Sequence, residues 1–142
     1  MEKPGEFIKK IENLTGKQII HSIQDAEPIG PKHLTDILII APCSGNTIGK
    51  LANGITDTPA LMAAKSHLRN EKPIVIAIST NDGLSSSAQN IGKLLNRNNF
   101  YFVPFRQDNP ITKPRSLVFD PRYIVKTLEQ ALDNEQIQPM LL

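Results

Sequence analysis

The chain has 142 residues, of which 39% are hydrophobic, and this is enough apolar material for one α/β domain spanning residues 1–142. Its 16 basic and 14 acidic residues are scattered, so the net charge of +2 argues against an arm that binds nucleic acid or a membrane surface. One cysteine, Cys43, permits no internal disulfide, and the lack of a signal peptide or an apolar stretch of ~20 residues predicts a soluble, cytoplasmic protein.

The N-terminal part of the chain predicts one helix and one strong strand. Apolar residues at helical spacing indicate a helix over residues 6–14, which Gly16 would end. Residues 18–23 fit a short strand, and the glycine and prolines in residues 25–34 predict a loop or a broken turn. The β-branched run at residues 37–41 is typical of a strand covered on both faces in a parallel sheet.

Past this strand the sequence alternates between helical and extended patterns. Such an alternation predicts an α/β fold with a Rossmann-like or flavodoxin-like parallel sheet and helices on both of its faces. The expected elements are helices at 48–55, 59–69, 88–95 and 122–132, strands at 74–78 and 100–104, and an ordered loop at 105–116 that contains two prolines.

A polar turn follows each of the two strongest strands. Residues 42–47 offer short side chains, a glycine and the free amides of a helix N-terminus, which suit a phosphate or the polar edge of a heterocycle. Residues 79–83 form the second turn. Because the carboxyl ends of neighbouring parallel strands meet at one edge, we expect one site built from both turns. Ser44 and Asn46 are equally favoured as helix caps, and neither a phosphate-loop nor a dinucleotide fingerprint is present.

Other reactive side chains give weaker indications. Cys43 lies between a strand and a helix N-terminus, where a nucleophile is conceivable, but no histidine is placed to activate it and a space-filling role beside a ligand is favoured. Asp57 and Asp82 fit acid–base groups or helix caps, of which the cap is favoured. The histidines lack metal-ligand spacing, so we expect no metal site and three solvated side chains: His21, His33 and His67.

The first polar turn belongs to a longer motif. Residues 39–57, IIAPCSGNTIGKLANGITD, resemble the A-P-A-[ST]-A-N-T segment and its continuation in the flavin-containing cysteine decarboxylases. In that family the loop packs against the flavin, a role that the resemblance carries to Ser44 and Asn46. Asn81 matches the asparagine of the family's P-A-M-N segment. The resemblance implies bound FMN and these cofactor-contacting residues: Ala41, Cys43, Ser44, Gly45, Asn46, Ser79, Thr80 and Asn81.

One departure argues against simple decarboxylation. The decarboxylases carry an active-site histidine eight residues before the aspartate that precedes the strand, and Pro28 stands at that position here. The remaining segments, among them ITDTPALMAAKSHLRN and YFVPFRQDNP, resemble the family of dipicolinate synthase B subunits over residues 7–142. That resemblance implies a flavoprotein oxidoreductase of sporulation, which works with a dehydrogenase-like A subunit in the mother-cell cytoplasm to oxidise dihydrodipicolinate to dipicolinate. The alternatives are a non-catalytic partner subunit and a decarboxylase of the phosphopantothenoylcysteine type.

The resemblance also bears on assembly and on the substrate. Relatives carry a strand, a glycine-serine loop and a helix before the equivalent of Phe7, so we expect the phosphate side of the flavin site to lie outside this sequence. The family implies homo-oligomers, trimers or multiples of them. Catalytic residues are not identified by the sequence. Guanidinium groups match carboxylate geometry, which makes Arg106 and Arg115 candidates for binding the two carboxylates of dihydrodipicolinate.

Overall fold

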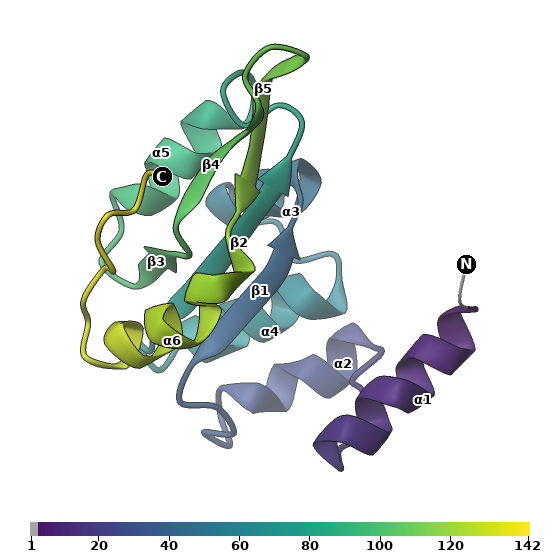
Figure 1. Ribbon diagram of the computed structural model, residues 1–142. Helices are drawn as coiled ribbons and strands as arrows, with labels where there is room; N and C mark the ends of the chain where they lie inside the picture. The colour runs from purple at the N-terminus through teal and green to yellow at the C-terminus, as the bar shows by residue number, and fades with distance from the viewer. Residues whose placement is uncertain (1–2) are drawn as a thin grey trace.

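The central strand of the fold is β2 (Ile74–Thr80), in a computed structural model that describes residues 3–142. It pairs in parallel with β1 (Leu38–Cys43) along one edge and with β3 (Phe100–Phe102) along the other (Figure 1). The antiparallel hairpin of β4 (Phe105–Asn109) and β5 (Lys113–Phe119) joins the carboxyl end of β2 through β5. The result is a five-stranded mixed sheet, with β1 at one edge and β4 at the other.

Helices cover both faces of this sheet, as predicted for the α/β class. Alternation along β2 sends Ile74, Ile76 and Ile78 to the face covered by α3, α4 and α5, and sends Val75 and Ala77 to the face covered by α6. All five of these side chains are fully buried. The helices are α1 (Pro4–Thr15), α2 (Ile23–Ala26), α3 (Gly45–Ala52), α4 (Pro59–Leu68), α5 (Ala88–Leu95) and α6 (Ile124–Leu132), with 3-10 turns η1 (Glu27–Ile29) and η2 (Pro121–Tyr123).

Two predicted elements are wrong. Residues 18–23 form no strand, because the Ser22 hydroxyl accepts a hydrogen bond from the Asp25 amide and caps α2 instead. Residues 105–116 are mostly a β-hairpin and not a loop. The other predicted helices and strands are confirmed within a few residues of their expected ends.

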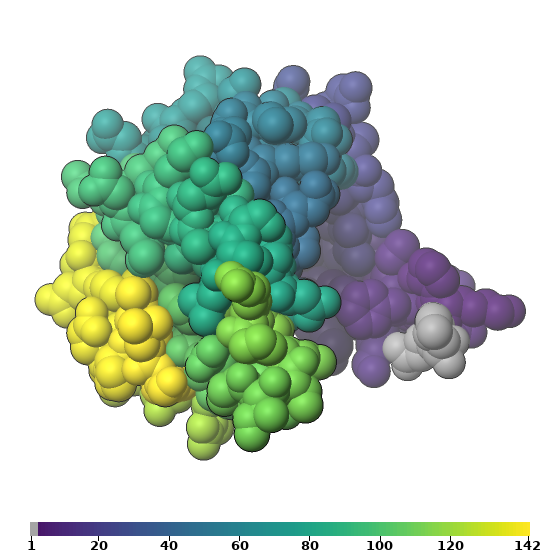
Figure 2. All heavy atoms as spheres, turned by 90° about the horizontal axis from the view of Figure 1, so that it is seen from above, coloured from purple at the N-terminus to yellow at the C-terminus, as the bar shows by residue number. Residues whose placement is uncertain are grey.

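Helix α1 stands apart from the sheet. It ends at Gly16, whose φ of 65° is the left-handed conformation predicted for a helix stop, and none of its residues is buried. The Ile19 amide donates to Glu12 and so ties the following segment to the helix. Seen from above, the purple helix projects from one side of the molecule (Figure 2). Across residues 3–142, no helix combines the length and apolar character that a membrane crossing needs.

Candidate flavin site at the carboxyl ends of β1 and β2

The two polar turns lie against each other, because β1 and β2 are neighbouring parallel strands. Gly45 begins α3, and a Cβ placed on it would lie 2.6 Å from Oγ1 of Thr80 and 2.8 Å from Oδ1 of Asp82. The view from above looks on these turns, where the blue and teal segments adjoin (Figure 2). The predicted juxtaposition of the two turns is therefore present, and glycine at position 45 permits it.

Ser44 serves as the cap of α3. Its hydroxyl accepts a hydrogen bond from the Thr47 amide at 3.2 Å and donates to Thr47 Oγ1 at 3.1 Å. Ser44 therefore has the role of a helix cap, which is one of the two roles predicted for it. The cap fixes the turn that carries the exposed side chain of Asn46. The Asn46 side chain makes no hydrogen bond within the described part of the chain, so its amide group is available to a ligand.

Asp82 organises the second turn. Its carboxylate accepts hydrogen bonds from the hydroxyls of Thr80, Ser86 and Ser87 at 2.6, 2.9 and 2.8 Å. These bonds, led by that of Thr80, lower the pKa of Asp82 below its ordinary value. Ser87 and not Asp82 stands at the N-cap of α5, so Asp82 braces the turn that leads into the helix. A carboxylate that is ionised and accepts three hydrogen bonds is a weak base, so Asp82 is poorly suited to abstract a proton.

The helix cap predicted for Asp57 is wrong. Thr58 caps α4 by accepting from the Leu61 amide, whereas Asp57 accepts two hydrogen bonds from Lys50 Nζ at 3.0 and 2.9 Å. Lys50 therefore has its charge compensated within the protein and is not a free cation for a phosphate.

The second turn divides its side chains between the two faces of the sheet. Alternation sends Thr80 toward α3 and α5, where Asp82 holds it, and sends Ser79 and Asn81 toward the opposite face. Ser116 donates to Asn81 Oδ1 at the long distance of 3.5 Å. A hollow of about 380 Å³ opens beside this turn and is lined by Ser79, Thr80, Asn81, Asp108, Ser116, Leu117 and Val118.

Cys43 lies in the core and not in the hollow. Its side chain is fully buried among the apolar residues on the α3 side of the sheet, and burial raises the pKa of the thiol to about 12. A thiol in this environment is a poor nucleophile, which agrees with the favoured space-filling role. Ala41 and Pro42 precede it on the exposed edge strand.

Arg106 and Arg115 make separate contacts. Arg106 is paired in register with Val118, whereas Arg115 lies in the part of β5 where the register with β4 shifts. Arg115 Nη1 donates to the Leu84 carbonyl at 3.3 Å, and Arg106 Nη1 reaches Asp120 at 3.4 Å. Arg106, paired in register with Val118, shares the face of Ser79, and the binding of one dicarboxylate by both arginines stays a prediction.

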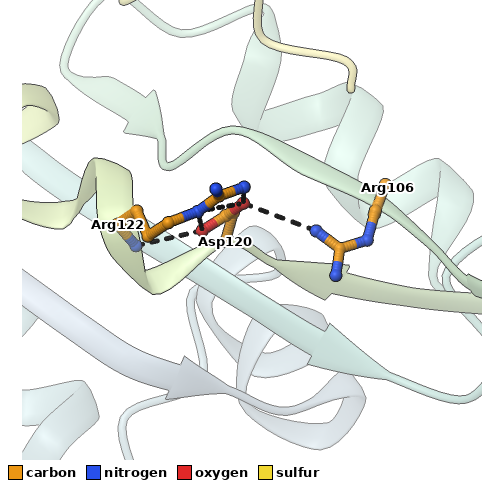
Figure 3. A network of polar contacts seen from close by, with 3 residues as sticks. All are labelled: Arg106, Asp120 and Arg122. Atoms are coloured by element: carbon orange, nitrogen blue, oxygen red, sulfur yellow. Dashed lines mark hydrogen bonds and ion pairs between the residues drawn. The ribbon is translucent and has the colours of Figure 1, made fainter.

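Asp120 is a site residue that the sequence pattern did not reveal. Its side chain is 4% exposed and is held by Arg122 Nη2 at 2.6 Å and Nε at 3.0 Å as well as by Arg106 (Figure 3). The hydrogen bonds from Arg122 lower the pKa of Asp120 to about 2. The sequence pattern that could have identified this residue is Asp120-Pro121 directly after a strand, which is typical of a capped helical turn.

The histidines differ from expectation in one case. His21 and His33 are exposed as predicted, but His67 is fully buried, with Nδ1 at 2.7 Å from Thr35 Oγ1 and Nε2 at 2.8 Å from the Pro73 carbonyl. The prediction of a solvated His67 is therefore wrong. Among residues 3–142 no group of histidine, cysteine and acidic side chains has a metal-binding arrangement.

The donor set in the two turns suits the ring of a flavin better than its phosphate. Asn46, Ser79 and Asn81 offer amides and hydroxyls, which match the polar edge of a heterocycle. Lys50, the one lysine of α3, is paired with Asp57. Within the described chain, α3 therefore offers no free cation to a phosphate at the first turn. These side chains could hold the polar edge of a flavin ring at the carboxyl ends of β1 and β2.

Comparison with known proteins identifies a family and several relatives. The Flavoprotein family matches residues 3–131. The chain is 48% identical over 138 residues to the dipicolinate synthase B subunit of Bacillus subtilis (strain 168), an alignment that covers 97% of this chain and 69% of the relative. The crystal structure of the dipicolinate synthase B subunit from Bacillus halodurans C superposes with a TM-score of 0.95 at 46% identity, over 100% of this chain and 73% of that chain.

A more distant match concerns the fold alone. The FMN-dependent cysteine decarboxylase SpaF superposes with a TM-score of 0.63 at 24% identity, over 87% of this chain and 71% of that chain. The matched residues and the two Bacillus relatives show that the chain belongs to the Flavoprotein family.

Proposed function

We propose that this chain is the B subunit of a dipicolinate synthase, an FMN-dependent oxidoreductase that converts dihydrodipicolinate to dipicolinate together with an A subunit. The observation that carries the proposal is the meeting of the two polar turns at Gly45 and Thr80, in a chain 48% identical to a dipicolinate synthase B subunit. The cytoplasmic, sporulation-linked setting and the homo-oligomer belong to the same proposal and rest on that relative.

In this proposal Asn46 and Asn81 hold the polar edge of the flavin ring, with Ser79 between the ring and the hairpin. Flavin mononucleotide, when bound, supplies a two-electron acceptor for hydride removal from the substrate. Ala41, exposed on the edge strand, allows the ring close access because its side chain is small, and Gly45 permits the contact between the two turns. Cys43 supports the turn from the core side.

The substrate's carboxylate is assigned to Arg106. Asp120 holds this guanidinium through a single Nη1 contact, and half of the Arg106 side chain is exposed, so several of its donors remain free. Arg106, Val118 and Ser79 occupy consecutive strands in register, which separates the arginine from the second turn by roughly 10 Å at ordinary strand spacing. That spacing leaves room for a small dicarboxylate between the two.

A non-catalytic partner role is the second candidate. It is favoured by the internal engagement of Ser44, Thr80 and Arg115, whose side chains all make hydrogen bonds within the chain. A decarboxylase of the phosphopantothenoylcysteine type is the weakest alternative, because Pro28 occupies the position of the expected histidine.

Anaerobic mixing of the flavin-loaded protein with dihydrodipicolinate separates these roles. The protein is incubated with FMN, desalted, and followed by absorbance at about 450 nm, where the oxidised cofactor absorbs. An oxidoreductase bleaches this band as dipicolinate accumulates. Retained flavin that substrate does not bleach would support the partner role, and loss of flavin on desalting would overturn the assignment of the cofactor.

A further inference from the structure

The hollow beside the second turn contains an acidic side chain that has no role so far. Among the described residues that line this space of about 380 Å³, Asp108 alone carries an ionisable group. It comes from β4, two residues beyond Arg106, which corresponds to roughly 7 Å at the ordinary rise of a strand. Ser79 and Asn81 line the same hollow. Asp108 is therefore within reach of a small molecule held between the second turn and the hairpin.

The carboxylate of Asp108 is open to a ligand. Lys113 Nζ donates to its Oδ2 atom at 3.0 Å across the end of the hairpin. The other oxygen, Oδ1, accepts no hydrogen bond within residues 3–142, and 38% of the Asp108 side chain is exposed. The Lys113 side chain is 58% exposed, so water reaches the ion pair. Asp108 thus combines a free acceptor oxygen with a path to solvent for a proton.

The other titratable groups near the two turns are already engaged. Asp82 accepts hydrogen bonds from three hydroxyls, and Asp120 is 4% exposed and held by two arginines. Cys43 is fully buried, and burial raises the pKa of its thiol to about 12. Within the described chain, no histidine lines the hollow. Asp108 is therefore the accessible base at this site.

The proposed reaction needs such a base. Oxidation of the dihydro ring removes a hydride, which carries its electron pair to the flavin, and a proton, whose C–H bonding pair forms the new double bond of the aromatic ring. We propose that Asp108 Oδ1 accepts this proton, and that the ion pair with Lys113 holds the carboxylate in place and passes the proton to water. This role rests on the proposed oxidoreductase function, to which it adds a catalytic residue.

Asp108→Asn in the FMN-loaded protein tests this role. Asparagine keeps the shape of the side chain but cannot accept the proton, so anaerobic bleaching of the flavin by dihydrodipicolinate should slow about 10²- to 10⁴-fold. Asp108→Ala should be similarly slow, and added formate should accelerate it by supplying a small carboxylate in place of the lost one. Asp133→Asn makes the same change at an exposed position after α6, and its rate should stay within about twofold of wild type.

Binding of the product gives a readout that does not depend on turnover. Calorimetric titration with dipicolinate, a dianion, should show about two- to tenfold tighter binding to Asp108→Asn than to the wild type. The variant removes a negative charge from the hollow and frees Lys113 to attract the ligand. Unchanged affinity would show that the ligand does not lie beside Asp108 and would overturn the role.

The rates separate this role from the proposed function. If the wild type bleaches and Asp108→Asn bleaches within about twofold of that rate, Asp108 is not the proton acceptor, while the oxidoreductase function stands. If the wild type retains flavin that the substrate does not bleach, the proposed function fails and the role of Asp108 fails with it. Slow bleaching by Asp108→Asn, tighter binding of dipicolinate and rescue of Asp108→Ala by formate are the expected results.

Discussion

Gly45 touches Thr80 so closely that a methyl group at position 45 would lie 2.6 Å from the Thr80 hydroxyl oxygen. This contact joins the turn after β1 to the turn after β2. It also places the first residue of α3 against Asp82 and Ser87, with corresponding separations of 2.8 and 3.0 Å. The two turns therefore behave as one unit, which a change in either one disturbs.

Gly45→Ala is expected to destabilise the protein and to impair flavin binding. The added methyl group forces the two turns apart, at a cost of about 1–3 kcal/mol typical of overpacked sites. Gly92→Ala is the matched control, because a Cβ at this position of α5 meets no atom within 4 Å. That helix substitution should stabilise by about 0.5–1 kcal/mol. Urea unfolding of both variants measures the difference, and equal effects would contradict the contact.

Asp82→Ala is expected to release the second turn. Three hydroxyls lose their acceptor, and each partly exposed hydrogen bond contributes about 1 kcal/mol. Because hydrogen bonding lowers the pKa of Asp82 below 3.8, its contribution is complete above that pH and is lost as pH falls through the folded value. Acid unfolding should therefore be less steep in the variant than in the wild type. An unchanged profile would show that Asp82 does not brace the turn.

The hairpin at residues 105–119 shows why proline and polar residues misled the prediction from sequence. Pro110 lies in the turn between the strands, and Pro114 lies where β5 has β4 on one side but not yet β2 on the other. A missing backbone donor is tolerated at such a position. Polar residues in β4 follow from its place at the sheet edge, where side chains remain exposed. The periodicity of a sequence does not indicate which strand becomes the edge.

Strands β1 and β2 and the two polar turns could be predicted, because the surroundings of these segments are reflected in the sequence pattern. The runs at 37–41 and 74–78 are apolar because helices cover both faces of the sheet at β1 and β2, and the polar residues after each run mark the carboxyl edge of the sheet. His67 was not predictable, since its burial depends on Thr35 and on the carbonyl of Pro73, both brought to it by the fold. Asp120 likewise gains its partner Arg106 from the pairing of β4 with β5.

Lowering the pH is expected to destabilise the protein through His67. Burial lowers the pKa of His67 below its ordinary value of 6.5. On acidification, the unfolded chain therefore takes up a proton at a higher pH than the folded protein does. Stability should fall as pH drops below about 6.5 and should level off below the folded pKa. Thermal unfolding of the wild type and of His67→Gln between pH 7 and 5 measures this. We expect a flatter profile for the variant, and identical slopes would contradict the role of His67.

Asp120→Asn is expected to loosen the hairpin from η2. Two arginines lose their anionic partner, and the buried site keeps only neutral hydrogen bonds. Asp108→Asn is the matched control, because its pair with Lys113 lies on the exposed hairpin and such pairs contribute about 0–1 kcal/mol. The melting temperature should fall further for Asp120→Asn than for Asp108→Asn. A reversed order would contradict the structural role of Asp120.

The most direct test of the flavin site is a pair of amide ¹H–¹⁵N correlation spectra, recorded on the labelled protein with and without FMN. We predict shifts concentrated in residues 44–47 and 79–82, and loss of these shifts in the Asn46→Ala, Asn81→Ala double variant. Shifts confined to one of the two turns, or shifts elsewhere in the chain that the double variant retains, would contradict the claim that the turns form one flavin site.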